Sequence, residues 1–141
     1  MKPISHRGNL RGPDPYTENK PNQITSLLNR GIDVEIDLWF VDGKLYLGHD
    51  NPTHETDSKW LIQNSDKLWV HLKNLNAMSC PVVKQLNYFW HENDKFTLTS
   101  KGIPWCFPNV FLEQGVTVVL TNEKITKNIF GVCTDYVEDY L

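Results

Sequence analysis

The stretch that most constrains the fold of this chain is residues 33–50, where two acids alternate with aliphatic residues ahead of a turn. Only Ile36 separates Glu35 from Asp37, so in a β-strand both carboxylates point to one face and the aliphatic side chains to the other. Two acids on a strand that also has a core face are costly unless something compensates them. A divalent cation is the usual compensation, and oxygen ligands suit Mg²⁺ or Ca²⁺. The alternative is a plain hairpin with solvated acids, and this stretch alone does not decide between the two.

The second half of the same stretch predicts a β-hairpin. Asp42-Gly43 is a strong turn dipeptide, and Leu45 and Leu47 alternate on the returning strand. The return carries the chain back toward the start of the hairpin. It therefore delivers His49 and Asp50 close to the acid-bearing strand.

Length and composition limit the broad class of protein. The chain has 141 residues, 40% of them hydrophobic, so we expect one domain over residues 1–141 with a substantial core. A net charge of −3 gives no basic surplus for nucleic acid, and no run approaches membrane-spanning length. Cys80, Cys106 and Cys133 are an odd number without metal-type spacing, which favours reduced thiols and a cytoplasmic location.

Local patterns predict strands that alternate with helices early in the chain. The first expected helix begins at Pro21 and is stopped by Gly31. Two more are expected over residues 58–63 and 77–86, with a helical turn at 122–129. Residues 51–57 are expected to be a polar loop. The expected strands cover residues 2–5, 33–48 as a hairpin, 68–73, 88–90, 96–100, 103–107, 116–120 and 130–133. This alternation favours a parallel α/β sheet, although the later connections are too short for the roughly 30 residues of a full βαβ unit.

Polar residues collect at the ends of three expected strands. His6 and Arg7 end the first, Glu35 and Asp37 lie on the second, and His71 and Lys73 share a face of a later one. Parallel strands bring their carboxyl ends to one edge, where ligands bind. Arginine and lysine hold phosphate, a cation neutralises its oxygens, and histidines transfer protons near neutral pH. Together these groups suit the cleavage of a phosphodiester.

Each piece also has an ordinary explanation. His6-Arg7-Gly8 alone is more often a surface turn, and His49-Asp50 can simply end a hairpin, with the aspartate bonded to its own backbone. His71 can be a hydrogen-bonded core histidine, and Lys73 can be an ordinary solvated lysine. Aromatic residues such as Trp105 can line the site, although core packing is their commoner role. Only the joint placement at strand ends favours the functional interpretation.

The chain resembles the glycerophosphodiester phosphodiesterases in an ordered set of motifs. These motifs are Ile4-Ser5-His6-Arg7-Gly8, Glu18-Asn19, Asp33-Val34-Glu35-Ile36-Asp37, and Asp42-Gly43 through His49-Asp50. A weaker likeness covers residues 131–135, so the first fifty residues carry most of the match. Each motif is short, but their combined order and spacing are highly specific.

The resemblance implies a fold and a role for each matched residue. It implies an α/β chain with a trimmed TIM-type (β/α) barrel whose second half is reduced, because a full barrel takes about 250 residues. His6 and His49 would form the catalytic acid/base pair, in either order, and Arg7 and Lys73 would contact phosphate. The implied metal ligands are Glu35, Asp37 and His71, and the supporting residues are Glu18 and Asn19.

One departure from the family pattern concerns the metal. His71 stands where the family has a third acid, which favours a softer or more weakly held ion than Mg²⁺ or Ca²⁺. The leading hypothesis is therefore a metal-dependent phosphodiester hydrolase acting on a small molecule, without a nucleic-acid partner or stable membrane insertion. A second subunit could cover an open sheet edge. The alternative is a degenerate phosphodiesterase-like domain that binds a phosphorylated ligand or a protein partner without catalysis.

Overall fold

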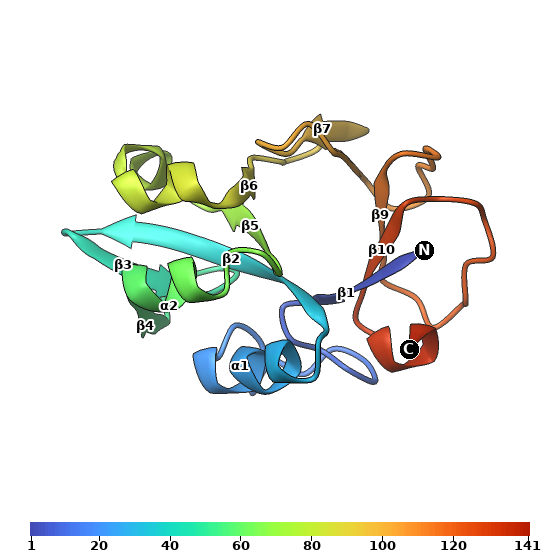
Figure 1. Ribbon diagram of the computed structural model, residues 1–141, viewed down its shortest axis with the longest axis horizontal. Coiled ribbons are helices and arrows are strands. Elements are labelled where there is room, and N and C mark those ends of the chain that lie inside the picture. The colour runs from blue at the N-terminus through green and yellow to red at the C-terminus, as the bar shows by residue number, and fades with distance from the viewer.

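The computed structural model describes residues 1–141 as one ten-stranded mixed sheet with two α-helices and three 3₁₀ turns. A parallel series runs in the order β6-β5-β2-β1-β10-β9-β8, with β7 antiparallel to β8 and with β3 and β4 extending antiparallel from β2. Figure 1 shows this sheet curling around its inner face. The strands are β1 (Lys2–His6), β2 (Asp33–Val41), β3 (Lys44–Leu47), β4 (His54–Thr56), β5 (Leu68–Leu72), β6 (Asn87–Phe89), β7 (Phe96–Leu98), β8 (Pro104–Cys106), β9 (Val116–Val119) and β10 (Gly131–Thr134). The helical segments are α1 (Pro21–Asn29), α2 (Ser58–Gln63), η1 (Leu75–Ser79), η2 (Pro81–Gln85) and η3 (Val137–Tyr140).

The expected trimmed TIM-type barrel is wrong. That architecture needs a helix after each parallel strand, whereas only α1 and α2 are α-helical here and the sheet is a curled half-barrel of mixed strands. The expected helix over residues 77–86 is replaced by η1 and η2, because Pro81 supplies no N–H for a continuous helix. Residues 122–129 form no helix, and the expected loop over 51–57 contains β4. Neither α-helix has the length and apolar character needed to cross a bilayer.

Helix α1 forms where the sequence predicts it. Pro21 occupies the first helical turn after an N-cap at Lys20, and Gly31 follows the helix with a φ of +82°. Ile24, Leu27 and Leu28 recur at helical spacing and are buried against the sheet. This helix covers the outer face of β2 after the chain leaves β1.

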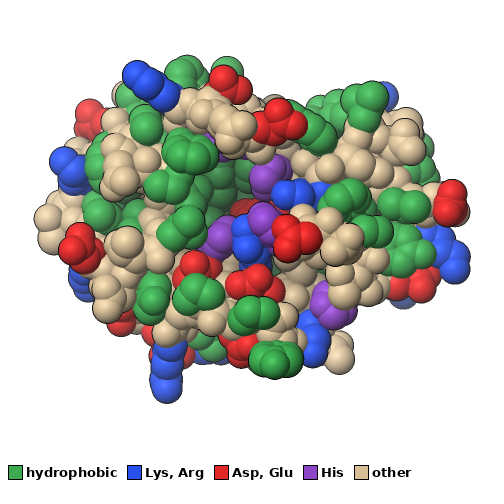
Figure 2. All heavy atoms as spheres, turned by 180° about the vertical axis from the view of Figure 1, so that it is seen from behind, with side chains coloured by type: hydrophobic (Ala, Val, Ile, Leu, Met, Phe, Trp, Pro, Cys, Tyr) green, Lys and Arg blue, Asp and Glu red, His purple; other side chains and the backbone are tan.

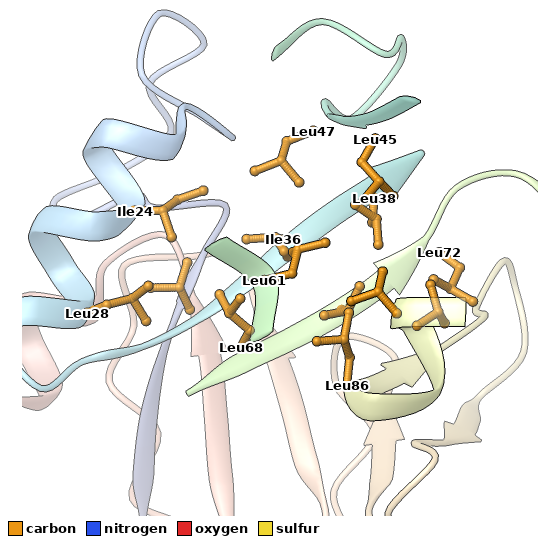
Figure 3. Close-up of a cluster of buried hydrophobic side chains, with 14 of the residues drawn as sticks. Ile24, Leu28, Ile36, Leu38, Leu45, Leu47, Leu61, Leu68, Leu72 and Leu86 are labelled. Atoms are coloured by element: carbon orange, nitrogen blue, oxygen red, sulfur yellow. The ribbon is translucent and has the colours of Figure 1, made fainter. Parts of the chain in front are cut away.

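The main hydrophobic core lies between the outer face of the sheet and the helical segments (Figure 3). Val34, Ile36 and Leu38 of β2 point into it, with Leu68, Val70 and Leu72 of β5 beside them. Because side chains alternate along a strand, Glu35 and Asp37 point to the opposite face, into the curl of the sheet. The outer core therefore fixes the direction of the acid pair.

A smaller core fills the inside of the curl. Its aromatic members are close together: the ring centroids of Trp69 and Trp105 lie 5.7 Å apart, and those of Phe89 and Trp105 lie 4.5 Å apart. Ile4 and Cys133 complete it from β1 and β10. Two residues after Ile4 and Cys133 come the polar residues His6, at the end of β1, and Asp135, directly after β10. The inner core is therefore a floor, and the polar residues lie above it at the carboxyl ends of the parallel strands.

Candidate active site

The strand register brings the polar strand ends together. His6 pairs with Glu35 between β1 and β2, and Asp37 pairs with His71 between β2 and β5. Figure 2 shows histidine, lysine, arginine and acidic side chains gathered around a hollow in one face of the molecule. A cavity of about 190 Å³ is lined on one side by His6, Arg7, Glu35 and His71. Six of the residues singled out in the sequence thus belong to one cluster, His6, Arg7, Glu35, Asp37, His71 and Lys73.

The acid pair is buried and incompletely satisfied. Glu35 is 2% exposed and Asp37 is 0% exposed, yet Glu35 Oε2 and Asp37 Oδ1 have no hydrogen-bond partner. Buried polar atoms are nearly always paired, so these two oxygens are available to a ligand such as a cation. His71 Nδ1 lies 3.8 Å from Glu35 Oε1 and 3.4 Å from Asp37 Oδ1. One ligand atom from each of the three residues lies within 4.8 Å of the others, which is close enough to share a metal ion.

The orientation of His71 suits a metal ligand. Its Nε2 lies 3.0 Å from the carbonyl oxygen of His91, so Nε2 carries the proton and donates it. The ring also stacks on Phe89 at a centroid distance of 5.0 Å. Nδ1 therefore faces the two carboxylates. A backbone carbonyl that holds the far nitrogen of a histidine is the usual support for a metal ligand.

Two permanent cations flank the acid pair. Arg7 Nε lies 3.3 Å from Asp37 Oδ2, and Lys73 Nζ lies 3.7 Å from Asp37 Oδ1. Arg7 also lies 3.6 Å from Glu18 Oε2, where it reaches the first loop. Four carboxylates lie in or beside the cluster, those of Glu18, Glu35, Asp37 and Asp135. Only the two permanent cations oppose their negative charge. One or two negative charges remain, depending on the protonation of His6, and a divalent cation would balance them.

The backbone at Arg7 and Asn19 is held in an unusual conformation. Both residues have a φ of +56°, a region that non-glycine residues rarely adopt. Asn19 donates from Nδ2 to Asp37 Oδ2 at 2.9 Å and accepts from the backbone N–H of Asp37 at 3.0 Å. Its own N–H donates to the carbonyl of Arg7 at 2.9 Å. Asn19 therefore joins the first loop to the acid-bearing strand, and such strained positions concentrate at functional sites.

His6 is held by an aspartate from the far end of the sequence. Its Nδ1 lies 2.8 Å from Asp135 Oδ1, and Asn9 Nδ2 donates to the same oxygen at 2.7 Å. On the other side, His6 Nε2 lies 3.9 Å from Glu35 Oε2. Burial by itself lowers the pKa of His6, but the hydrogen bond to Asp135 and the charge of Glu35 outweigh burial and raise it. This environment favours a protonated imidazole.

His49 lies in an adjoining hollow rather than in the main cavity. That hollow is lined by Glu18, Asn19 and Gly48 as well as His49, and the histidine bonds only to Asp50, at 2.8 Å. Glu18 and Asn19 connect the two hollows through their contacts with Arg7 and Asp37. Burial first, and then the charge of Arg7, lower the pKa of His49. The two histidines are thus shifted in opposite directions.

The two acids also differ in their titration. Burial and the neighbouring charge of Asp37 raise the pKa of Glu35. Burial would raise the pKa of Asp37 as well, but the contact with His71 and the charges of Arg7 and Lys73 outweigh it and lower that pKa. Asp37 is therefore ionised near neutral pH, and Glu35 is the acid that most needs a cation.

Gly48 determines where His49 can lie. A Cβ at this position would collide with the carbonyl oxygen of Asn51, and the Gly48 carbonyl accepts the indole N–H of Trp39 at 2.6 Å. We expect Gly48→Ala to displace the His49 loop and to lower turnover by about 10- to 100-fold, because small misplacements of reacting groups are costly.

The matched control for Gly48→Ala is Gly102→Ala, which also strains the backbone but meets no neighbouring atom. It should lower the melting temperature and leave turnover unchanged. Steady-state kinetics and thermal melts of both variants check this, and equal turnover in the two would contradict a positioning role for Gly48.

Sequence reasoning assigned no role to three residues of this region. Asp135 follows directly after β10, and the rule that located His6 and His71 at strand ends would have found it. Asn9, which bridges Asp135 and Glu18, lies in a loop and has no pattern to mark it. His91 contributes only its backbone carbonyl to His71, which no residue type reveals.

Comparisons with protein family models, with curated proteins and with solved structures found no match for this chain. The chemistry assigned to the cluster therefore depends on its own geometry. That geometry consists of two unsatisfied buried carboxylates, a histidine oriented toward them, two cations, and two further histidines.

Proposed function

We propose that the chain is a metal-dependent phosphodiester hydrolase with histidine acid–base catalysis. The observation that carries the proposal is the pair of unsatisfied oxygens on Glu35 and Asp37, which His71 Nδ1 faces. The residues of this cluster fit a divalent cation. The resemblance of the motif order to glycerophosphodiester phosphodiesterases supports the same class of substrate.

Phosphate binding falls to Arg7 and Lys73. Both contact Asp37 in the structure. A cation that neutralised this carboxylate would leave the two basic side chains free to bind an anionic ligand. When bound, the cation would supply neutralisation of the charge that develops on the phosphoryl oxygens. Arg7, held by Asp37 and Glu18, offers fork-like donors for two oxygens.

The histidines divide the proton transfers. His49, whose surroundings disfavour a proton, would accept the proton of a substrate hydroxyl adjacent to the phosphate as that oxygen forms a bond to phosphorus. His6, held by Asp135, would donate a proton to the leaving alcohol as its bond to phosphorus breaks. This first step releases the alcohol and leaves a cyclic phosphodiester, with His49 protonated and His6 neutral. Water would then attack phosphorus as His6 accepts its proton and His49 returns its proton to the ring oxygen that leaves, so both histidines regain their starting states and the net reaction is hydrolysis.

The donor set also bears on which cation binds. Mg²⁺ or Ca²⁺ is the expectation for oxygen ligands, but an imidazole beside two carboxylates is a mixed set that manganese accepts more readily. We expect Mn²⁺ to raise the melting temperature more than equal concentrations of Mg²⁺ or Ca²⁺, and His71→Glu to reduce this difference. Thermal melts at several concentrations check it, and identical shifts for the three ions would contradict a nitrogen ligand.

The proposed function is tested by turnover of phenyl glycerol phosphate, an aryl phosphodiester with a hydroxyl adjacent to the phosphate, with each cation and with a chelator. Cation-dependent product formation that the chelator abolishes is the expected result. Full activity in the chelator would overturn the metal role, and no product with any cation would overturn the hydrolase.

A second function, binding of a phosphorylated ligand without catalysis, is favoured by one observation. His49 makes no hydrogen bond or ion pair with the cluster that contains His6, and its side chain is half-exposed. Cation-dependent binding of phosphate with no product from any ester would support this alternative.

A further inference from the structure

The cavity above the acid pair has two chemically different walls. The polar wall holds His6, Arg7, Glu35 and His71, as described above, and His91 also lines the cavity, edge-on to the ring of Phe107. The opposite wall comes from β8, β9 and the segments that follow them, and its side chains are Trp105, Phe107, Pro108, Val118 and Leu120. Figure 2 shows hydrophobic side chains around the rim of the hollow, next to its charged groups.

Two residues of the apolar wall leave apolar surface open beside the cavity. Phe107 is 41% exposed and Leu120 is 47% exposed, although both lie beside a charged cluster. Leaving such side chains in water forgoes the stabilisation that their burial would give. Apolar surface that borders a polar site is typical of a ligand-binding cavity, where an apolar part of the ligand covers it.

We propose that the substrate of this site is a phosphodiester with one apolar alcohol group, an aryl group or an acyl-bearing chain, that packs on Phe107 and Leu120. This inference rests on the proposed function, because it takes the phosphate to lie over the acid pair. The apolar group then extends from the phosphate toward β8 and β9, on the side away from His49.

The size and charge of the cavity agree with this occupant. Its volume of about 190 Å³ is enough for a phosphate and a ring or a few methylene groups. A longer chain would continue over the exposed rim. Glu92 also lines the cavity, so a second anionic group on the substrate would be repelled there.

The first experiment measures binding without turnover. Methyl phosphate, hexyl phosphate and phenyl phosphate carry the same anionic group and differ only in the apolar part. With Mn²⁺ present, we expect calorimetry to give an affinity for hexyl or phenyl phosphate about ten-fold or more above that for methyl phosphate, since each buried methylene contributes several-fold. The hexyl and phenyl esters separate a chain-bearing substrate from an aryl one.

Variants locate the effect on the apolar wall. Leu120→Asn should remove most of the preference for hexyl phosphate and leave the affinity for methyl phosphate unchanged. Leu112→Asn is the matched control, because Leu112 has a similar exposure of 43% and does not line the cavity. It should leave both affinities unchanged.

A second experiment compares hydrolysis of bis(glycero)phosphate, its 1-hexanoyl ester and phenyl glycerol phosphate. Higher kcat/KM for the hexanoyl or phenyl compound, lost in Leu120→Asn, supports the inference. Equal affinities for methyl, hexyl and phenyl phosphate, or a preference for the apolar esters that survives Leu120→Asn, would overturn the inference. Either result would leave the phosphodiesterase proposal intact. Failure of every phosphate to bind with any cation would overturn both.

Discussion

His6→Ala is expected to lower kcat by about 10²- to 10⁴-fold, the usual effect of losing a general acid or base. Asp135 and Glu35 flank its imidazole, so the side chain is placed to hold a proton rather than to pack a core. The melting temperature should change little by comparison. Steady-state kinetics with a saturating cation and thermal melts check both parts.

A control aromatic residue outside both hollows separates this effect from a general loss of a ring. Phe96 lies on β7 and is exposed, and Phe96→Ala should leave kcat within about two-fold of the unmodified protein. If His6→Ala retains full activity, the proton donor has been assigned wrongly and the catalytic role of the cluster is lost with it.

Asp135→Asn should act on the same proton in a graded way. The hydrogen bond that His6 donates to Asp135 is one of the contributions that raise the pKa of His6 above its ordinary value, so removing the charge of Asp135 lowers that pKa. A general acid loses activity as the pH rises through its pKa. The alkaline limb of the profile of kcat/KM against pH should therefore move to lower pH, and an unshifted limb would restrict Asp135 to a structural role.

Glu35→Gln is expected to stabilise the metal-free protein and to abolish its response to a cation. The buried carboxylate has a raised pKa and an unpaired oxygen, so ionising it at neutral pH opposes folding. The uncharged amide removes that cost, and we expect the free energy of unfolding to rise by about 1 kcal/mol or more. Without the carboxylate, Mn²⁺ should no longer raise the melting temperature, and turnover should be lost.

The pH dependence of the same variant gives an independent check. An acid whose folded-state pKa is raised binds its proton more tightly when folded, so its ionisation destabilises the protein as the pH rises from the ordinary value toward the raised one. The metal-free protein should therefore gain stability relative to Glu35→Gln as the pH falls through that window. Glu55→Gln, at an exposed acid on β4, should show neither effect. A cation shift that persists in Glu35→Gln would place the ion elsewhere.

The local rules of the sequence predicted the acid-bearing hairpin well. Side chains alternate along β2, and its aliphatic residues Val34, Ile36 and Leu38 are buried in the core. Glu35 and Asp37 therefore lie together on the opposite face. The turn at residues 42–43 and helix α1 followed equally local signals. These elements depend on neighbours in the sequence, and such neighbours are visible in it.

The expectations that failed depend on distant contacts. The barrel was inferred from the resemblance of the first fifty residues, but short connections later in the chain leave no room for the outer helices. Strand β4 is polar and forms only because β3 offers it an edge. The contact between His6 and Asp135 depends on the pairing of β1 with β10, which no local pattern encodes.

That pairing has a consequence for how the protein acquires its chemistry during synthesis. His6 and Asp135 are 129 positions apart, and β1 sits between β2 and β10 in the sheet. A growing chain can thus assemble the carboxylate pair early, while the imidazole of His6 has no orienting partner until translation passes residue 135. Pairing strands that are so far apart in the sequence makes folding slow. The hydrogen bond between His6 and Asp135 would therefore form only when β10 pairs with β1, late in folding.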